Sequence, residues 1–261
     1  MSIKLCILGS GSRGNSTFIG TEKTRILVDA GLSARKTAAR LAEIGESVEA
    51  IDAICVTHEH IDHIGGVRVL HKKYGIPVYA NGGTMDGVRA SMKGVELRSC
   101  QFTTGSAFEI GDIQMEPFPL SHDAYEPVGF IFRNGGITIG LATDMGIVTH
   151  LLREKLRTCN VVVIESNHDE AMVHEAPRPW SLKQRILSNQ GHLSNRASAE
   201  LIAEIANEGL THLFLAHLSS DCNSPSHARR EFETVLSAAG HNHIMVRLTA
   251  ADCVSDVLEL E

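Results

Sequence analysis

The stretch VTHEHIDHIGG, residues 56–66, concentrates side chains that bind metal ions. The apolar residues before it are typical of a buried strand, and past the strand end residues two apart in the extended chain face the same way. One cation could therefore be faced by His58 and His60 together, whereas Asp62 and His63 follow as the chain turns into a helix and suit a second ion. The spacing differs from the H-E-x-x-H of helical zinc proteases, because Asp62 stands where that motif needs its second histidine.

A site for two metal ions needs more ligands than these four. Three further stretches can supply them: PLSHDAY with His122, GLATDMG with Asp144, and LFLAHLS with His217. In each stretch a polar residue follows an apolar run, and strand ends that converge on one edge of a sheet make a pocket. Taken alone, each also fits an ordinary surface histidine or turn residue.

Short apolar runs alternate with helical patterns along the chain. We predict strands at 3–8, 17–19, 26–29, 53–57, 78–80, 107–110, 113–119, 128–133, 137–142, 161–165, 213–216 and 244–248. Helices are predicted at 34–44, 66–74, 85–92, 147–156, 181–188, 194–208 and 226–239, with Ser194 as an N-cap and Gly75 and Gly209 as stops. This pattern favours two packed sheets with outer helices in one domain, residues 1–261.

Composition excludes several classes of protein. A net charge of −7 argues against a protein that coats polyanions in general, although a bound metal pair adds local positive charge. The six cysteines are spread out with no C-x-x-C, which is typical of a reduced cytoplasmic protein. The N-terminus lacks the features of a secretory signal, and no apolar run is long enough to cross a bilayer, so no membrane association is expected.

THEHIDHIGG, followed in order by His122, Asp144 and His217, resembles the metallo-β-lactamase fold superfamily over essentially the whole chain. The resemblance implies an α/β fold, a four-layer αββα sandwich with a dinuclear metal centre at one edge of its sheets. It further implies that one metal is bound by His58, His60 and His122. The other would be bound by Asp62, His63 and His217, with Asp144 bridging the two.

Two cations roughly 3.5–4 Å apart can share a hydroxide and lower its pKa, so that it attacks a carbonyl carbon or a phosphorus atom. The metals also stabilise the negative charge that develops on the substrate. Imidazole and carboxylate ligands suit zinc or manganese, and iron is also compatible with them.

Four segments narrow the choice within the superfamily: LGSGSRGNST, ESNHDEAM, WSLKQRILSNQGHLSN and HLSSDCNSP. Together they resemble the YycJ/WalJ group, related to ribonuclease Z, which implies a metal-dependent exonuclease acting on DNA, with RNA as another possible substrate. The alternative is a hydrolase of a small phosphodiester, a thioester or a lactone with the same metal centre. A non-catalytic binding module on a decayed hydrolase fold is disfavoured, because all seven ligands are present.

The resemblance also gives roles to residues outside the ligand set. It implies that His192 donates a proton to the leaving oxygen and that Glu165 steadies it, so His192, Glu165 and Asp62 are the catalytic candidates. The substrate-binding candidates are His168, which alternatively only supports neighbouring residues, and Ser10, Ser12 and Asn15, which fit a phosphate-binding loop or a plain turn equally well. The basic stretch around Trp180, from Arg178 to Arg185, could hold a nucleic acid, but a solvated helix face is favoured.

Overall fold

The computed structural model describes residues 2–92 and 94–261 and divides them into two compact units. Unit 1 comprises the chain up to Pro119 together with Ala124–Ile137 and Ala250–Glu261, and unit 2 comprises Leu120–Asp123 and Thr138–Thr249. Each unit is described separately below. None of the helices in the described part of the chain has the length and apolar composition that a membrane crossing requires.

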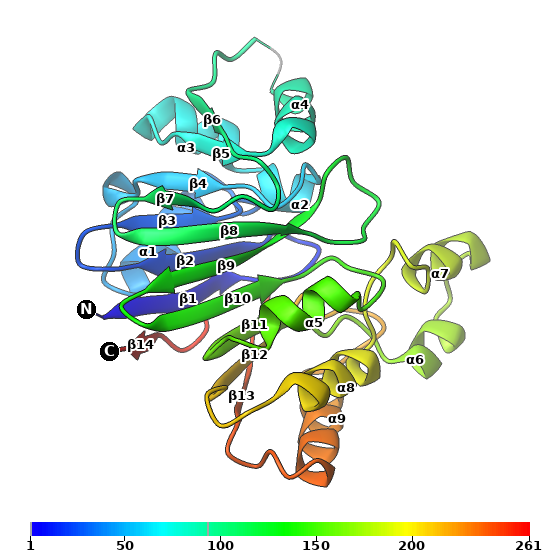
Figure 1. Cartoon of the computed structure of the whole chain (residues 1–261). Coiled ribbons are helices and arrows are strands. Elements are labelled where there is room, and N and C mark those ends of the chain that lie inside the picture. Colours follow the sequence, from blue (N-terminus) through cyan, green and yellow to red (C-terminus); the bar gives the residue numbers. More distant parts are fainter. Residues whose placement is uncertain (1, 93) are drawn as a thin grey trace. The chain divides into compact units, whose positions relative to one another are not determined.

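Unit 1 contains a seven-stranded sheet in the order β14-β1-β2-β3-β4-β5-β6 (Figure 1). Neighbouring strands are antiparallel from β14 to β3 and parallel from β3 to β6. The strands are β1 (Ile3–Gly9), β2 (Ser16–Gly20), β3 (Arg25–Val28), β4 (Ala53–Cys55), β5 (Val78–Ala80), β6 (Ser99–Gln101) and β14 (Leu258–Leu260). The same unit holds an antiparallel run of β7 (Phe108–Ile110), β8 (Ile113–Pro119) and β9 (Val128–Asn134).

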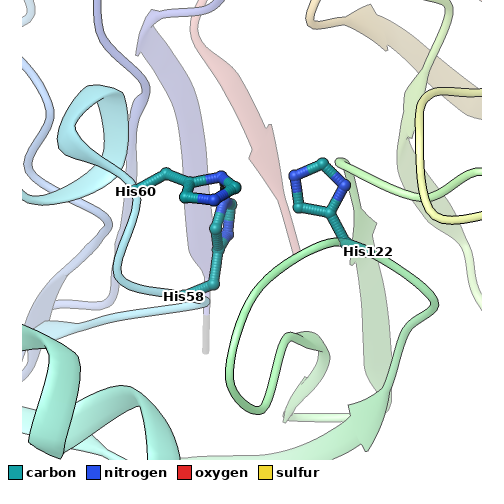
Figure 2. A group of neighbouring side chains, drawn as sticks. All are labelled: His58, His60 and His122. Carbon is teal, nitrogen blue, oxygen red and sulfur yellow. Dashed lines mark hydrogen bonds between the residues drawn. The ribbon is translucent and has the colours of Figure 1, made fainter. Parts of the chain in front are cut away.

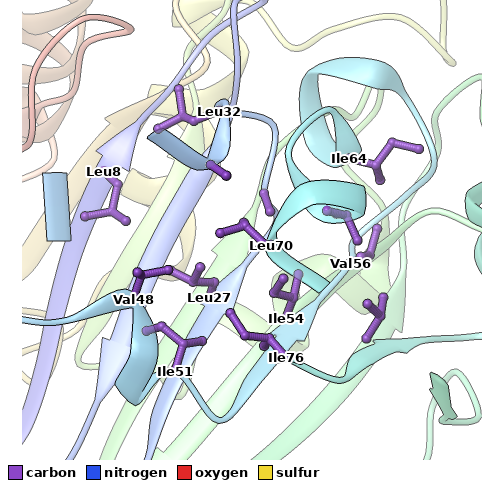
Figure 3. Packing of buried hydrophobic residues seen from close by; sticks show 14 of the residues in the cluster. Leu8, Leu27, Leu32, Val48, Ile51, Ile54, Val56, Ile64, Leu70 and Ile76 are labelled. Carbon is purple, nitrogen blue, oxygen red and sulfur yellow. The ribbon is translucent and has the colours of Figure 1, made fainter. Parts of the chain in front are cut away.

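Helices of unit 1 cover this sheet through an apolar core (Figure 3). Leu27 of β3 and Ile54 of β4 are fully buried in one cluster with Leu70 of a helix. Burying each such side chain contributes about 1.5–3 kcal/mol, so the core fixes the strands whose ends carry the candidate ligands. The helical segments are α1 (Ala34–Glu43), η1 (Val48–Ala50), α2 (Ile61–Ile64), α3 (Val67–Tyr74) and α4 (Gly82–Ser91).

Unit 2 is built on parallel strands. Strand β11 lies between β10 and β12, and β13 pairs with β12. Helix α8 packs against β11 and beside α5 and α9 (Figure 1). Because parallel strands end at the same edge, residues that follow them come together there. The elements are β10 (Ile137–Ala142), α5 (His150–Leu156), β11 (Val161–Glu165), α6 (Glu170–Glu175), α7 (Trp180–Ile186), α8 (Asn195–Ile205), β12 (His212–Ala216), α9 (Pro225–Ala238) and β13 (Met245–Leu248).

Most predicted elements are confirmed to within a few residues, and Ser194 and Gly75 cap helices as expected. The short elements β6, β14, η1, α2 and α6 were missed. The helix predicted to end at Glu208 ends at Ile205, and Gly209 is not its cap. The cause is Asn207, whose side chain accepts from Gly209 N–H at 2.8 Å and donates to a carbonyl at 2.9 Å, so it forms a turn instead. That residues 1–261 form one domain stays a prediction.

Candidate metal centre

In unit 1 two imidazoles of the histidine motif face each other just past β4. His58 Nε2 lies 3.1 Å from His60 Nδ1, and the rings meet edge to face (Figure 2). Thr57 Oγ1 donates its proton to Asp29 at 2.8 Å, so it must accept from Nδ1–H of His58, 3.0 Å away. This leaves Nε2 of His58 with a lone pair. That His58 and His60 bind one cation stays a prediction, and the protonated Nδ1 of His58 is the arrangement that a metal-binding histidine needs.

His63 is oriented in a similar way by a carboxylate. Its Nδ1–H donates to Asp29 at 2.7 Å, which leaves Nε2 as the available ligand atom. That Nε2 lies 3.7 Å from a carboxylate oxygen of Asp62 and 3.0 Å from the side-chain nitrogen of Asn15. Asp62 and His63 therefore place a carboxylate oxygen and a ring nitrogen side by side, and their binding of a second ion stays a prediction.

Asp29 organises the ligand cluster of unit 1, and it was not among the residues predicted from the sequence. Its carboxylate accepts from Thr57 N–H at 2.8 Å, from the Thr57 hydroxyl at 2.8 Å and from His63 at 2.7 Å. A signal was present, because Asp29 directly follows the apolar strand RILV in the same way that the candidate ligands follow theirs.

The backbone of the motif is held by a close approach to Gly31. A Cβ atom at this position would lie 1.6 Å from the carbonyl oxygen of Asp62, so only glycine fits. The same carbonyl accepts from Asn15 N–H at 2.7 Å. Of the predicted substrate-binding loop, Asn15 therefore lies against the ligands, whereas Ser10 is buried and Ser12 is exposed.

Unit 2 carries a second cluster, at the edge where its parallel strands end. Asp144, Glu165, His192 and His217 each offer a ligand atom, and these atoms lie within 4.8 Å of one another. His217 Nδ1 lies 3.4 Å from Asp144 and 3.0 Å from Glu165. His122, which follows β8 (Figure 2), points Nε2 at Asp144 from 3.9 Å while its Nδ1–H donates to the carbonyl of Gly191 at 3.1 Å.

The buried Glu165 and the partly exposed His192 form an acid–base pair in this cluster. Glu165 Oε1 lies 2.8 Å from His192 Nδ1, and its other oxygen accepts from the N–H groups of Met145 at 3.0 Å and Leu193 at 3.1 Å. Burial raises the pKa of Glu165, but the charge of His192 and its hydrogen bonds outweigh this and lower it to about 2. Burial lowers the pKa of His192, yet the charge and hydrogen bond of Glu165 raise it above its ordinary value.

Backbone strain concentrates in the two clusters. Among the described residues other than glycine, three have positive φ: Asp29 at 60°, Asp144 at 61° and His217 at 55°. This conformation costs roughly 1–2 kcal/mol per residue, and such strain is typical of functional sites. All three residues come one or two positions after a strand, where the turn aims the side chain at its cluster.

The remaining predicted residue, His168, is buried outside both clusters. Its Nδ1 lies 3.3 Å from the amide oxygen of Asn167, whose nitrogen donates to the carbonyl of His217 at 2.8 Å. His168 also lines a cavity of about 380 Å³ with Ser194 and Arg230. It can thus support the position of His217 or contact a ligand in this cavity, so both interpretations stay open.

The basic stretch around Trp180 is engaged within the protein. Arg178 pairs with Asp221, Arg185 with Asp123 at 2.6 Å, and Lys183 donates to a backbone carbonyl at 2.5 Å. The exposed Arg185 fits the solvated helix face that the sequence favoured, whereas Lys183 is buried and departs from it.

The donor sets fit divalent metal ions. They consist of imidazole nitrogens and carboxylate oxygens, which suit zinc, manganese or iron. Metal-binding histidines almost always donate their other N–H to a carboxylate or a carbonyl. His63 does so to Asp29, and His122 does so to Gly191.

Comparison with known proteins identifies the family. A family model described as a beta-lactamase superfamily domain matches residues 24–217. The exodeoxyribonuclease YycJ of Bacillus anthracis is 38% identical over 241 residues, which make up 92% of this chain and 91% of that protein. The exodeoxyribonuclease WalJ of Streptococcus pneumoniae serotype 2 is 40% identical over 226 residues, 85% of this chain and 84% of that protein.

A solved structure supports the same assignment at the level of fold. The metallo-β-lactamase fold protein YhfI from Bacillus subtilis aligns over 100% of both chains with a TM-score of 0.75, at 15% identity. The predicted α/β class and fold are therefore confirmed. The chain belongs to the metallo-β-lactamase superfamily and, within it, to the family of the exodeoxyribonucleases YycJ and WalJ.

Proposed function

We propose that this protein is a metal-dependent phosphodiesterase that degrades DNA from an end. Two relatives with 38% and 40% identity are named exodeoxyribonucleases. The observation that carries the proposal within the chain is the Glu165–His192 pair. His192 lies in one cluster with Asp144 and His217, and the Glu165 carboxylate beside it would favour the protonated ring that a proton donor needs.

The proposed ligand set contains seven residues. One divalent ion would be held by His58, His60 and His122, the other by Asp62, His63 and His217, and Asp144 would serve both. When bound, the ions supply an activated water and stabilise negative charge on the phosphate. Zinc and manganese are the proposed metals, with iron as a further candidate, because the donors are nitrogen and oxygen only.

His192 would complete the reaction by protonating the leaving group. Hydrolysis of a phosphodiester breaks one P–O bond, and the departing alkoxide needs a proton. Glu165 occupies Nδ1 of His192 at 2.8 Å, so Nε2 is the atom that donates. Glu165 then carries the negative charge that keeps the ring protonated until transfer, and its own position is fixed by two backbone N–H groups.

The remaining expectations belong to the same proposal. Asn15 touches Asp62 and His63 and would contact the phosphate, as would Ser10, Ser12 and His168. Residues 1–261 would act as one hydrolase domain. A cytoplasmic location fits six cysteines that form no disulfide.

Degradation of labelled substrates tests the proposal. We expect Mn²⁺ or Zn²⁺ to support stepwise loss of nucleotides from 5′- or 3′-labelled DNA, with RNA of the same sequence as a comparison. Bis-p-nitrophenyl phosphate tests the phosphodiesterase chemistry without a nucleic acid. Turnover of lactones or thioesters with no cleavage of any phosphodiester would contradict the proposal and favour the alternative hydrolase.

A further inference from the structure

Two exposed apolar side chains adjoin the histidine motif of unit 1. Ile61 is 73% exposed and Tyr125 is 71% exposed, and they are the two most exposed large hydrophobic side chains among the described residues. Ile61 directly follows His60 in the chain. Tyr125 is tied to the same motif, because its backbone N–H donates to the carboxylate of Glu59, between the two histidines, at 2.9 Å.

The backbone that carries Tyr125 is firmly anchored. The next residue, Glu126, accepts at its carbonyl from Asn81 at 2.8 Å, and its carboxylate accepts from Thr104 at 2.7 Å and from Gly83 N–H at 3.0 Å. The backbone that carries the exposed Tyr125 ring is therefore held in place by hydrogen bonds. Ile61 likewise opens the short helix α2, whose first carbonyl accepts from Gly65 N–H at 2.8 Å.

From this arrangement we infer that Ile61 and Tyr125 form a contact surface for an unpaired nucleobase near the end of the DNA strand. The inference rests on the proposed function and adds how the strand is held. Scattered exposed apolar residues are normal on protein surfaces, but here the two largest exposures occur on segments that border one histidine pair. In this arrangement the ligand cluster binds the phosphate, and Ile61 and Tyr125 contact the base.

Charge supports stacking as the source of affinity. The chain has a net charge of −7, so general attraction for the phosphate backbone is weak. Stacking on an aromatic ring does not depend on base identity, because every base has a π face. An enzyme that removes successive nucleotides must accept each base in turn, and an exposed tyrosine ring meets this requirement, with the exposed Ile61 as a further apolar contact.

Single-stranded oligonucleotides with and without terminal bases test the inference. One DNA is unmodified, a second has abasic residues at three positions at each end, and a third has three internal abasic residues. Binding is measured by fluorescence anisotropy in chelator, and KM and kcat are measured with Mn²⁺. The proteins are wild type, Tyr125→Ala, Tyr125→Phe and Ile61→Ala, with Val69→Ala as control because Val69 is 50% exposed on α3.

For Tyr125→Ala we expect Kd and KM for unmodified DNA to rise about 5- to 100-fold, with the loss on KM rather than kcat. Tyr125→Phe keeps the ring and should retain affinity, Ile61→Ala should give a smaller loss, and Val69→Ala should bind as wild type does. The wild type should bind the end-abasic DNA as weakly as Tyr125→Ala binds unmodified DNA. Tyr125→Ala should bind the unmodified and the end-abasic DNA with the same affinity. Internal abasic residues should have little effect.

The inference is overturned if wild type and Tyr125→Ala treat unmodified and end-abasic DNA alike. It is also overturned if light scattering shows a wild-type dimer that Tyr125→Ala abolishes while DNA binding is unchanged, because the surface would then join two copies of the chain. Base-dependent binding without cleavage under any metal would leave the inference standing and refute the proposed function. Absence of both binding and cleavage would refute both.

Discussion

Replacing Asp29 by asparagine tests how the metal ligands of unit 1 are oriented. The change preserves side-chain shape, and asparagine tolerates the positive φ of 60° at this position. It removes the negative charge and converts one acceptor oxygen into a donor. One oxygen of this carboxylate accepts from Thr57 N–H, and the other accepts from the Thr57 hydroxyl and from His63, all within 2.8 Å. At least one donor must therefore face the new NH₂ group whichever way the amide turns.

Each orientation of the amide has its own consequence. If the NH₂ group faces Thr57 N–H, a buried donor loses its acceptor, which costs about 1–3 kcal/mol of unfolding free energy. If it faces His63, the imidazole must accept at Nδ1 and carry its proton on Nε2, the atom needed for a metal. Loss of such a supporting partner lowers metal affinity about 10- to 100-fold.

Both quantities are measurable on the same preparation. Zinc affinity is obtained by competition between metal-free protein and a chromophoric chelator, and unfolding free energy by urea titration in EDTA. Asp52→Asn is the matched control, because the carboxylate of Asp52 also accepts a backbone N–H, that of Arg25 at 2.8 Å, but at the surface. Wild-type values for both affinity and stability in Asp29→Asn would refute the orienting role.

Two further predictions concern catalysis and acid stability. His192→Ala should lower kcat on labelled DNA about 10²- to 10⁴-fold while bound metal, measured by atomic emission, stays near wild type, and an equal loss of metal would make His192 a ligand rather than a proton donor. Asp112→Asn should lose stability only above acid pH: although burial raises the pKa of Asp112, hydrogen bonds from Thr24 and Thr21 hold it below its ordinary value. A group with a lowered folded pKa stabilises the protein above its unfolded pKa and loses this contribution as pH falls through the folded value. The wild-type advantage in urea unfolding should therefore disappear in acid, and a difference that persists there would contradict the assignment.

The sequence predicted the fold well because the apolar runs mark the strands and the candidate ligands lie just past the ends of those strands. Each candidate ligand outside the motif follows an apolar run, and β10, β11 and β12 do end at one edge of their parallel sheet. The short elements β6, β14 and α6 lack a recognisable period. Their three to six residues are too few to show one. Pairing with a neighbouring strand defines β6 and β14, and α6 begins at Asp169, whose side chain accepts from Met172 N–H.

The supporting residues were harder to predict than the ligands. Asp29 and Thr57 bind the histidines through hydrogen bonds that join positions up to 34 apart in the sequence. The apolar strand before Asp29 marks the end of β3, but it does not identify the partners of this carboxylate, because those depend on how β3 and β4 pair in space. Tyr125 is a similar case, since an exposed tyrosine in a loop is ordinary until its backbone is found bonded to the motif.

The positive φ of His217 allows a test of whether this residue serves metal binding or the fold. At φ 55° glycine, and to a lesser degree asparagine, is less strained than histidine. His217→Asn should therefore relieve part of about 1–2 kcal/mol of backbone strain. This gain offsets only part of the loss of its hydrogen bond to the charged Glu165 at 3.0 Å, which is worth about 1.5–3 kcal/mol. Unfolding free energy in EDTA should therefore fall by no more than about 2 kcal/mol, while zinc titration should show weakened binding of one ion. Destabilisation by several kcal/mol with unchanged zinc binding would mean that His217 is a structural residue, and the ligand set proposed for the second ion would be wrong.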